Sequence, residues 1–514
     1  MRPAATVKPR QTPAAKSQPI PPPVGGLNAK DSIADMPATD ALVLENFFPQ
    51  PDFVELRRGS TSHATGLGSA VESLLHWSGP TTQKMFGAVS ASIFDVTSSG
   101  SVGSADVTSL TNGRWQSVMQ ATSGGNFLII CNGADSVRNY DGSNWTTPSI
   151  TNVSSSTLDN VWLFKERLFF VEENTLSVWY LGTKAIAGAA TEFPLGSVFK
   201  KGGRLVAGGS LTRDGGAGPD DLCVFLTNRG EVAIYQGTNP ASASTFALVG
   251  IFDIPAPIGR RCLQKAGGDL AVITEGGVIS LNTMLELDRA AQERAAVTSK
   301  INRLFTADAR AYNANFGWQL LSYPRSNYFI VNVPASAGAV QYQYVMNALT
   351  GSWCKFTGLN ANCWSLFNED LYFGGNSGKV WKADNTRQDD GSPITGDLKT
   401  AFTDLGSPGN VKAAQMLRCL FTSNGTPGFL MNINTDFEDQ IPTSSPTPGD
   451  PPDSLWDAAT WDTSKWTAGQ SHSRLWIGAD GVGHTMAARL RVVSDGVSCT
   501  INGFDIITTL GRMV

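Results

Sequence analysis

RLFFVEENTLSVWY, residues 167–180, contains two short apolar runs joined by a polar turn. Runs of this length, rich in β-branched and aromatic residues and separated by a turn containing Asn, are typical of a β-hairpin. The second run ends on a large aromatic residue. This segment therefore predicts two antiparallel strands joined by a tight turn.

The same hairpin pattern occurs seven times between residues 84 and 381. The copies are KMFGAVSASIFDV (84–96), NFLIICNGADSVRNY (126–140), RLFFVEENTLSVWY (167–180), DLCVFLTNRGEVAIY (221–235), DLAVITEGGVISL (269–281), NYFIVNVPASAGAVQYQY (327–344) and DLYFGGNSGKVW (370–381). Their first apolar residues are 41 to 58 residues apart. A spacing near about 40–50 residues leaves room for two more strands per copy, as in the blades of a β-propeller.

We therefore predict a mainly β protein with a β-propeller of about seven blades over residues 61–390. The alternative is a pair of β-sandwiches whose hairpins recur at chance spacing. Three segments in which a turn is followed by Trp predict a third strand in their blades. They are NGRWQSVM (112–119), GSNWTT (142–147) and GSWCKF (351–356).

The interval between the fifth and sixth copies carries the strongest helical pattern. From Leu287 to Phe305, apolar or small residues recur at every third or fourth position. Acidic residues lie in the first half of this stretch and basic residues near its end, as the helix dipole favours. We predict a helical insertion over residues 284–305, between two blades.

The two ends of the chain differ from the repeats. Residues 1–26 contain seven prolines and four cations but no acidic residue, which predicts a disordered basic arm. Residues 391–514 lack the hairpin repeat but contain several strand-like runs and a Pro/Ser-rich loop, which predicts a separate C-terminal β domain.

The residue types that carry most enzyme chemistry are sparse or scattered. The seven cysteines and four histidines show no metal-ligand spacing, and the cysteines are odd in number, which predicts buried free thiols. No GxSxG or HExxH motif is present. We expect no enzymatic activity, no metal and no cofactor. No apolar run approaches 18 residues, and the first residues lack the apolar centre of a secretory signal.

The most unusual segment is SLWDAATWDTSKW, residues 454–466, which spaces Trp456, Trp461 and Trp466 by five residues. Trp476 follows ten residues later. A spacing of five matches neither one helix face nor one strand face. We interpret the four tryptophans as anchors of a subunit or domain interface, because interface cores are enriched in Trp. The alternative is a set of stacking platforms for sugar rings.

Several segments, taken in order along the chain, resemble the tail nozzle (tubular) proteins of short-tailed bacteriophages. They include the WDxxxWDxxxW run, the closing strands, LNAKDSIADMPATDALVLENFFPQPDFVELRRGS (27–60), RAAVTSKINRLF (294–305) and DDGSPITGDLKTAFTDLGSPG (389–409). The end of the chain, ITTLGRMV, departs from the Gly-Gly ending associated with such proteins.

The resemblance implies a homohexameric tube attached to the portal and the head-to-tail adaptor protein. The tube would retain the packaged genome and conduct DNA during ejection, without binding DNA specifically and without a small-molecule ligand. Residues 27–60 and the C-terminal β domain would form a platform that contacts the adaptor or tail fibres. The protein would be made and assembled in the bacterial host cytoplasm and would reside in the virion tail.

Two other classes remain open. One is a glycan- or receptor-binding β-propeller of a virion or cell surface. The other is a secreted propeller enzyme that cleaves glycans with carboxylates converging in its central tunnel. The expected free cysteines and the absence of a signal-like segment argue against the secreted enzyme.

Overall fold

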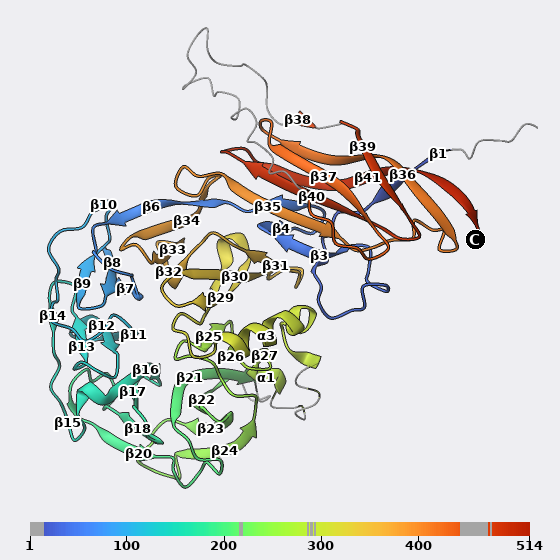
Figure 1. The fold of residues 1–514 in the computed structure, drawn as a ribbon. Helices are drawn as coiled ribbons and strands as arrows, with labels where there is room; N and C mark the ends of the chain where they lie inside the picture. Colours follow the sequence, from blue (N-terminus) through green and yellow to red (C-terminus); the bar gives the residue numbers. More distant parts are fainter. Residues whose placement is uncertain are drawn as a thin grey trace, which may run out of the picture. The chain divides into compact units, whose positions relative to one another are not determined.

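The computed structural model describes residues 15–214, 219–284, 287, 291, 294–442, 471–472 and 475–513 (Figure 1). The chain divides into two compact units: Arg58–Gly391, and a unit that combines Met1–Arg57 with Ser392–Val514. The unit boundaries fall within three residues of positions 60 and 390, where the sequence predicted them. None of the described helices is both long and apolar enough to cross a membrane.

Within the described residues, the strands of Arg58–Gly391 form seven blades, numbered 1–7, whose pairings are antiparallel except for the short β10 beside β6. Blade 1 consists of β7 (Ser73–Ser78), β8 (Gln83–Val89) and β9 (Ser92–Asp95), and blade 2 of β11 (Gln116–Thr122), β12 (Gly125–Cys131), β13 (Arg138–Tyr140) and β14 (Trp145–Thr146). Blade 3 consists of β16 (Leu158–Phe164), β17 (Arg167–Glu172), β18 (Ser177–Tyr180) and β20 (Thr191–Pro194). Blade 4 consists of β21 (Leu205–Asp214), β22 (Pro219–Thr227), β23 (Glu231–Gly237) and β24 (Phe246–Asp253). Two short strands, β15 (Ile150–Thr151) and β19 (Gly188–Ala189), pair with each other between blades.

Blades 5–7 complete the set. Blade 5 consists of β25 (Leu263–Ala266), β26 (Asp269–Thr274) and β27 (Gly277–Ser280). Blade 6 consists of β28 (Gln319–Tyr323), β29 (Tyr328–Ser336), β30 (Val340–Asn347) and β31 (Trp353–Phe356). Blade 7 consists of β32 (Ala361–Phe367), β33 (Asp370–Gly375), β34 (Val380–Thr386) and β6 (Gly59–Thr65), with β10 (Gly100–Ser101) beside β6. The first strand of each blade contacts the first strand of the next blade, and β32 contacts β7. The seven blades therefore form a closed ring, which is a β-propeller.

Strand β6 closes this ring. It precedes blade 1 in the sequence but pairs antiparallel with β34 of blade 7, with Ala64 opposite Val380. In Figure 1 the blue strand β6 runs beside the brown strand β34. Because the first and last strands of the unit share one sheet, backbone hydrogen bonds hold the ring shut.

The seven predicted hairpins are the second and third strands of the seven blades, so the propeller prediction is confirmed. Two of the three predicted additional strands are confirmed: β14 and β31 follow the hairpins of blades 2 and 6 and pair with β13 and β30. The third is wrong, because the segment containing Trp115 leads into β11, the first strand of blade 2, and adds no strand to blade 1. A turn followed by Trp marks where a strand begins, but it does not specify the blade to which that strand belongs.

Aromatic side chains fill the space between neighbouring blades. Between blades 3 and 4, the rings of Trp162 and Phe225 lie 5.9 Å apart, and those of Phe193 and Tyr235 lie 5.2 Å apart. Burial of each such side chain stabilises the fold by about 1.5–3 kcal/mol.

The inserted helix lies between β27 and β28, and therefore between blades 5 and 6, as predicted. Among the described residues, α1 is Leu281–Met284, the 3₁₀ turn η2 is Ser299–Ile301, and α3 is Asn302–Tyr312. Part of the predicted helix falls on residues 285–286, 288–290 and 292–293, which lie outside the described residues. The sequence placed the helix over 284–305, but α3 continues past Phe305 because Ala309, four residues later, extends the buried stripe. Thr298 belongs to a turn instead, where its hydroxyl accepts a hydrogen bond from the Val278 amide (3.1 Å).

The N- and C-terminal segments together form the second unit, which consists of two β-sheets. One sheet contains β4 (Phe47–Pro49), β5 (Val54–Leu56), β41 (Cys499–Met513), β36 (Asn410–Ser423), β38 (Ser471–His472), β39 (Ile477–Gly483) and β1 (Ala15–Ile20). The strands that this unit contributes to the other are β2 (Gly26–Leu27), β3 (Asp40–Glu45), β35 (Ile394–Thr400), β40 (Met486–Ser494) and β37 (Gly428–Thr435), paired in that order. The sheets approach closely at Gly396, where an added Cβ would lie 2.6 Å from the ring of Phe47.

The prediction of a disordered arm over residues 1–26 is wrong for its second half. Strand β1 pairs antiparallel with β41 over six residues, from Ala15 opposite Thr509 to Ile20 opposite Phe504. Ile20 is buried, whereas the other residues of β1 are exposed or half-buried. The strand is held by backbone pairing rather than by an alternating apolar face, so the sequence shows no strand pattern there. Residues 1–14 lie outside the described residues.

Candidate functional site

Of the four tryptophans predicted to form an interface, Trp456, Trp461 and Trp466 lie outside the described residues. Trp476 lies just before β39 and is half-buried. The guanidinium of Arg418 lies over its ring, 4.6 Å from the ring centre, and also pairs with Asp505 at 2.6 Å. Trp476 thus has a cation–π partner on β36 of its own unit. An interface role for the four tryptophans remains a prediction.

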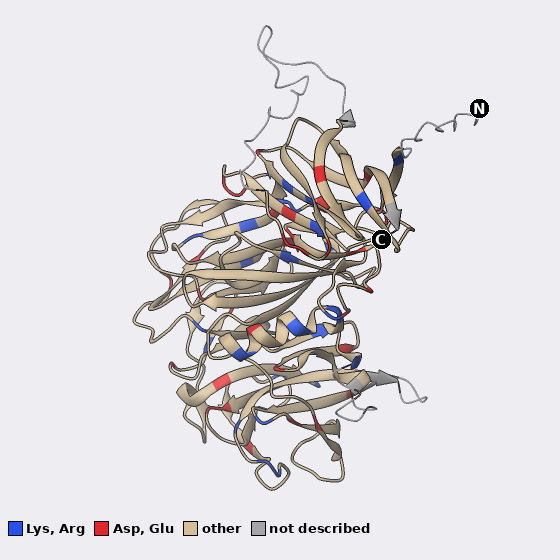
Figure 2. Ribbon diagram, turned by 45° about the vertical axis from the view of Figure 1, so that its right-hand side comes forward, with Lys and Arg blue, Asp and Glu red and all other residues tan. Residues whose placement is uncertain are grey.

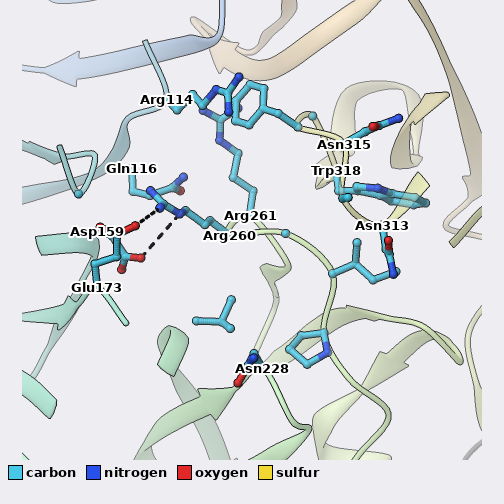
Figure 3. Close-up of a pocket in the computed structure, with 18 of the residues that line it drawn as sticks. Arg114, Gln116, Asp159, Glu173, Asn228, Arg260, Arg261, Asn313, Asn315 and Trp318 are labelled. Atoms are coloured by element: carbon cyan, nitrogen blue, oxygen red, sulfur yellow. Dashed lines mark hydrogen bonds and ion pairs between the residues drawn. The ribbon is translucent and has the colours of Figure 1, made fainter. Parts of the chain in front are cut away.

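A cavity in the propeller unit is lined by residues from several blades (Figure 3). It has a volume of about 690 Å³, and we call it the axial pocket. A second cavity of about 400 Å³ is lined by the first strands of several blades. The two cavities share the wall residues Gln116, Arg260 and Arg261, so these side chains separate two spaces along the centre of the ring.

The wall of the axial pocket is mainly polar. Its amides are Asn112, Gln116, Asn132, Asn228, Asn313 and Asn315, and its charged residues are Arg114, Arg204, Arg260, Arg261, Asp159, Glu173 and Glu275. The aromatic residues Phe316 and Trp318 complete one side. Such a wall offers many hydrogen-bond donors and acceptors in a confined space.

Arg260 connects three segments across the pocket. Its Nη2 lies 3.1 Å from Oε1 of Glu173, and its Nε lies 3.6 Å from Oδ2 of Asp159 (Figure 3). Its Nη1 donates a hydrogen bond to the backbone carbonyl of Asn132 at 2.9 Å. Arg260 precedes blade 5, whereas these partners belong to blades 2 and 3 or to the loops beside them. The side chain thus joins non-adjacent parts of the ring.

Asp159 is almost completely buried in the wall of the pocket, with 1% of its side chain exposed. Burial raises the pKa of Asp159 to about 6, although the nearby Arg260 acts in the opposite direction. Its Oδ1 has no hydrogen-bond partner among the described residues. The close packing depends on Gly133, which has φ +74°, because an added Cβ would lie 2.7 Å from Cβ of Asp159.

Arg261 points toward blades 1 and 2. Its Nη2 donates hydrogen bonds to Oγ of Ser73 (2.6 Å) and to the carbonyls of Glu72 (3.0 Å) and Trp115 (3.2 Å). The guanidiniums of Arg261 and Arg114 lie over the ring of Phe316, 5.1 and 4.5 Å from its centre. Burial lowers the pKa of Arg261. The acceptors of Arg261 carry no formal charge, so none of these hydrogen bonds neutralises it.

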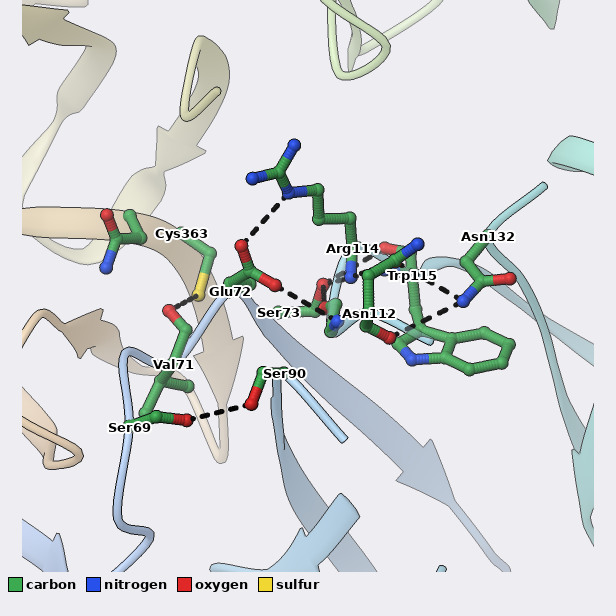
Figure 4. Close-up of polar contacts among 12 residues, drawn as sticks. Ser69, Val71, Glu72, Ser73, Ser90, Asn112, Arg114, Trp115, Asn132 and Cys363 are labelled. Carbon is green, nitrogen blue, oxygen red and sulfur yellow. Dashed lines mark hydrogen bonds and ion pairs between the residues drawn. The ribbon is translucent and has the colours of Figure 1, made fainter. Parts of the chain in front are cut away.

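Glu72 holds the polar wall beside Arg261 in place (Figure 4). Its carboxylate accepts hydrogen bonds from Nε of Arg114 (3.0 Å) and from the amide of Gly113 (3.0 Å). Ser73 donates to the carbonyl of Gly113 (2.6 Å) and accepts from the amide of Trp115 (2.9 Å). These contacts fix the start of blade 2 against blade 1.

The sequence did not identify this pocket. Its residues come from segments between blades and from inner strands, and they meet only because the ring closes. The adjacent cations of PIGRRC, residues 257–262, are the one local signal that could have marked it, since only 16% of the chain is charged. The seven cysteines are free and buried, as predicted. No cluster of potential metal ligands occurs among the residues that were described.

No protein-family model matches this sequence, and no curated protein matches it either. Among solved structures, the chain is similar to BBS1N in its complex with ARL6DN (TM-score 0.40, 9% identity, covering 63% of this chain and 96% of that one). It is also similar to Saccharomyces cerevisiae Sqt1 (TM-score 0.37, 12% identity, 63% and 98%). A quinoprotein alcohol dehydrogenase-like protein from Bacteroides thetaiotaomicron VPI-5482 gives a TM-score of 0.34 at 11% identity, covering 61% and 68%. We assign the propeller from its strand pairing and draw no function from these similarities.

Proposed function

We propose that this chain is the tail nozzle of a short-tailed bacteriophage, a structural virion protein that retains the packaged genome and conducts DNA during ejection. One feature supports this function most directly. Both ends of the chain fold into one β unit, and a complete propeller is inserted between them as the continuous segment Arg58–Gly391. A platform built from both chain ends, with an attached propeller, is the arrangement that the resemblance to tail nozzle proteins implies.

The centre of the propeller does not suit a DNA path. Arg260 crosses it with ion pairs to Asp159 and Glu173, and Arg261 fills the space beside Ser73. DNA would therefore pass through a channel enclosed by several copies of the chain. The resemblance to the nozzle family sets the expected number of copies at six.

The charge of the chain agrees with a conduit that does not retain DNA. Each chain carries a net charge of −5, so six copies carry −30. Figure 2 shows Lys and Arg interspersed with Asp and Glu on the described part of the ribbon, including α3. Each contact between a basic side chain and a DNA phosphate increases the affinity for DNA and its salt dependence. A conduit for DNA therefore benefits when its Lys and Arg residues are not clustered. The partners would be the head-to-tail adaptor protein and, on the platform, tail fibres.

Electron microscopy of virions labelled with an antibody against the propeller tests this function. We expect the label at the tail, below the portal. Particles that lack the protein should package DNA and then lose it. Label on the capsid shell, or stable full particles without the protein, would contradict the proposal.

A second candidate is the glycan- or receptor-binding propeller considered from the sequence. The observation that favours it is the polar axial pocket, whose volume of about 690 Å³ lies within the range of small-molecule sites. The two functions are compatible, since a virion tail protein can also carry a recognition site.

A further inference from the structure

Three buried polar atoms in residues that line the axial pocket have no hydrogen-bond partner among the described residues. They are Oδ1 of Asp159, Nε2 of Gln116 and Nη1 of Arg261. A fourth, Nε1 of Trp115, belongs to a residue lining the adjoining cavity. Buried polar groups in folded proteins are nearly always hydrogen-bonded, so several unpaired atoms at one cavity indicate a ligand-binding site.

The arginines of the pocket divide into two pairs. Arg114 and Arg260 form ion pairs with carboxylates. Arg261 donates only to uncharged oxygens, and no carboxylate forms a hydrogen bond or ion pair with Arg204 among the described residues. Asp159 interacts electrostatically with Arg204, and Glu72 with Arg261, without a hydrogen bond or ion pair between them. Two guanidiniums whose donors are not taken by a carboxylate favour an anionic ligand, because Arg binds carboxylates through paired, charge-assisted hydrogen bonds.

The remaining wall matches hydroxyl groups. Oδ1 of Asn228 accepts a hydrogen bond from the Arg204 amide (2.9 Å), which leaves the Nδ2 donors of Asn228 for a ligand. Nδ2 of Asn315 donates to the carbonyl of Pro334 (2.8 Å), which leaves its Oδ1 as an acceptor. Neighbouring amide donors and acceptors suit hydroxyls, which both donate and accept. The free oxygen of Asp159 adds a further acceptor.

We propose that the axial pocket binds a uronic acid, a sugar ring that carries one carboxylate and several hydroxyls. The carboxylate pairs with Arg204, Arg261 adds a second positive charge to the wall, and the hydroxyls bind the amides and Asp159. Asp159 and Arg261 line the cavity while their unpaired atoms are buried, so small side-chain rotations bring these atoms to the ligand. Arg260 and Arg261 separate this cavity from the next one, so the pocket accepts a single or terminal residue.

This site is independent of the nozzle assembly, and it departs from the expectation of no small-molecule ligand. The test uses the full-length protein and titrates D-glucuronate by isothermal calorimetry and saturation-transfer NMR. D-glucose is the neutral control, and inorganic phosphate is the control for a plain anion site. We expect saturable binding of glucuronate and at least about tenfold weaker binding of glucose and phosphate.

Matched variants locate the site. Arg204→Gln should weaken glucuronate binding about tenfold or more, whereas Arg303→Gln, on the exposed face of α3, should leave it unchanged. If Arg204→Gln lowers the melting temperature, Arg261→Lys provides a second test, because it keeps the charge but loses the paired donors.

Three results would overturn the proposal: no saturable binding up to about 50 mM glucuronate, equal binding of glucose or phosphate, or unchanged affinity in both pocket variants. The nozzle function is tested by the number of copies in the assembly, which does not depend on glucuronate binding. A negative binding result would therefore contradict the uronic acid site without contradicting the nozzle function.

Discussion

At the scale of a single residue, Asp159 contributes to the pH dependence of the stability of the propeller. Its folded pKa of about 6 lies above its ordinary value of 3.8, so the folded protein binds this proton more tightly than the unfolded chain. The stability that the proton confers is present below about pH 4 and is lost as the pH rises through about 6. The difference between the folded pKa of about 6 and the ordinary value of 3.8 corresponds to about 3 kcal/mol in the free energy of unfolding.

We predict that Asp159→Asn increases the free energy of unfolding at pH 7.5 by up to about 3 kcal/mol and changes it little near pH 4. Denaturant unfolding at both pH values measures this. Asp221→Asn is the control, because the carboxylate of Asp221 pairs with Lys165 (2.8 Å) and its removal should give no gain. A less stable Asp159→Asn protein at pH 7.5 would show that the contact with Arg260 outweighs the cost of burial.

Lys412 on β36 shows the opposite situation, a buried cation that is fully hydrogen-bonded. Its Nζ donates to the carbonyls of Ser407 (2.8 Å), Asn410 (3.1 Å) and His484 (2.6 Å). Lys412→Met keeps an unbranched apolar stem, one atom shorter than that of Lys, but leaves three carbonyls without this donor. We expect a loss of about 2–4 kcal/mol in unfolding free energy, whereas the exposed control Lys30→Met should change it by less than about 0.5 kcal/mol. Equal stability of the two variants would contradict this account.

At the scale of an element, β1 distinguishes the structure from the sequence-based expectation. A chain beginning at Gly25 lacks β1, so it loses the pairing with β41 and the burial of Ile20. We predict that its two-sheet unit is destabilised by about 2 kcal/mol or more. A chain beginning at Ala14 keeps β1 and should melt like the full-length protein. Calorimetry on the two truncated chains measures the difference. Identical melting of both would show that β1 does not stabilise the two-sheet unit.

The elements that the sequence predicted are those whose signal is local. Each central hairpin of a blade carries its own alternating strands and turn, so all seven were found. Strand β6, GSTSHAT, is largely polar and pairs with β34 more than 300 residues later, so no local pattern marks it. The axial pocket has the same origin, because Arg260 meets Asp159 only after the ring closes. The sequence also predicted helix at Thr298, which lies in a turn, because buried turn residues can share the spacing of a helix.

At the scale of the whole molecule, the strand pairing that closes the propeller ring lies entirely within the propeller segment. Because β6 and β34 both belong to Arg58–Gly391, we predict that residues 58–391 alone fold and unfold cooperatively. Removal of residues 58–65 should lower the melting temperature, since the outer edge of blade 7 would lose its partner strand. Circular dichroism melting of the two fragments tests this. Equal melting temperatures would show that β6 does not close the ring.

The assembly is the central claim. Native mass spectrometry of the full-length protein mixed with its head-to-tail adaptor measures the number of copies directly. We predict a particle that contains six copies of the 54.6 kDa chain, and we expect Ala at Trp456, Trp461 or Trp466 to weaken it. A chain that remains monomeric in the presence of the adaptor would contradict the nozzle function, because one propeller whose centre is crossed by Arg260 offers no path for DNA.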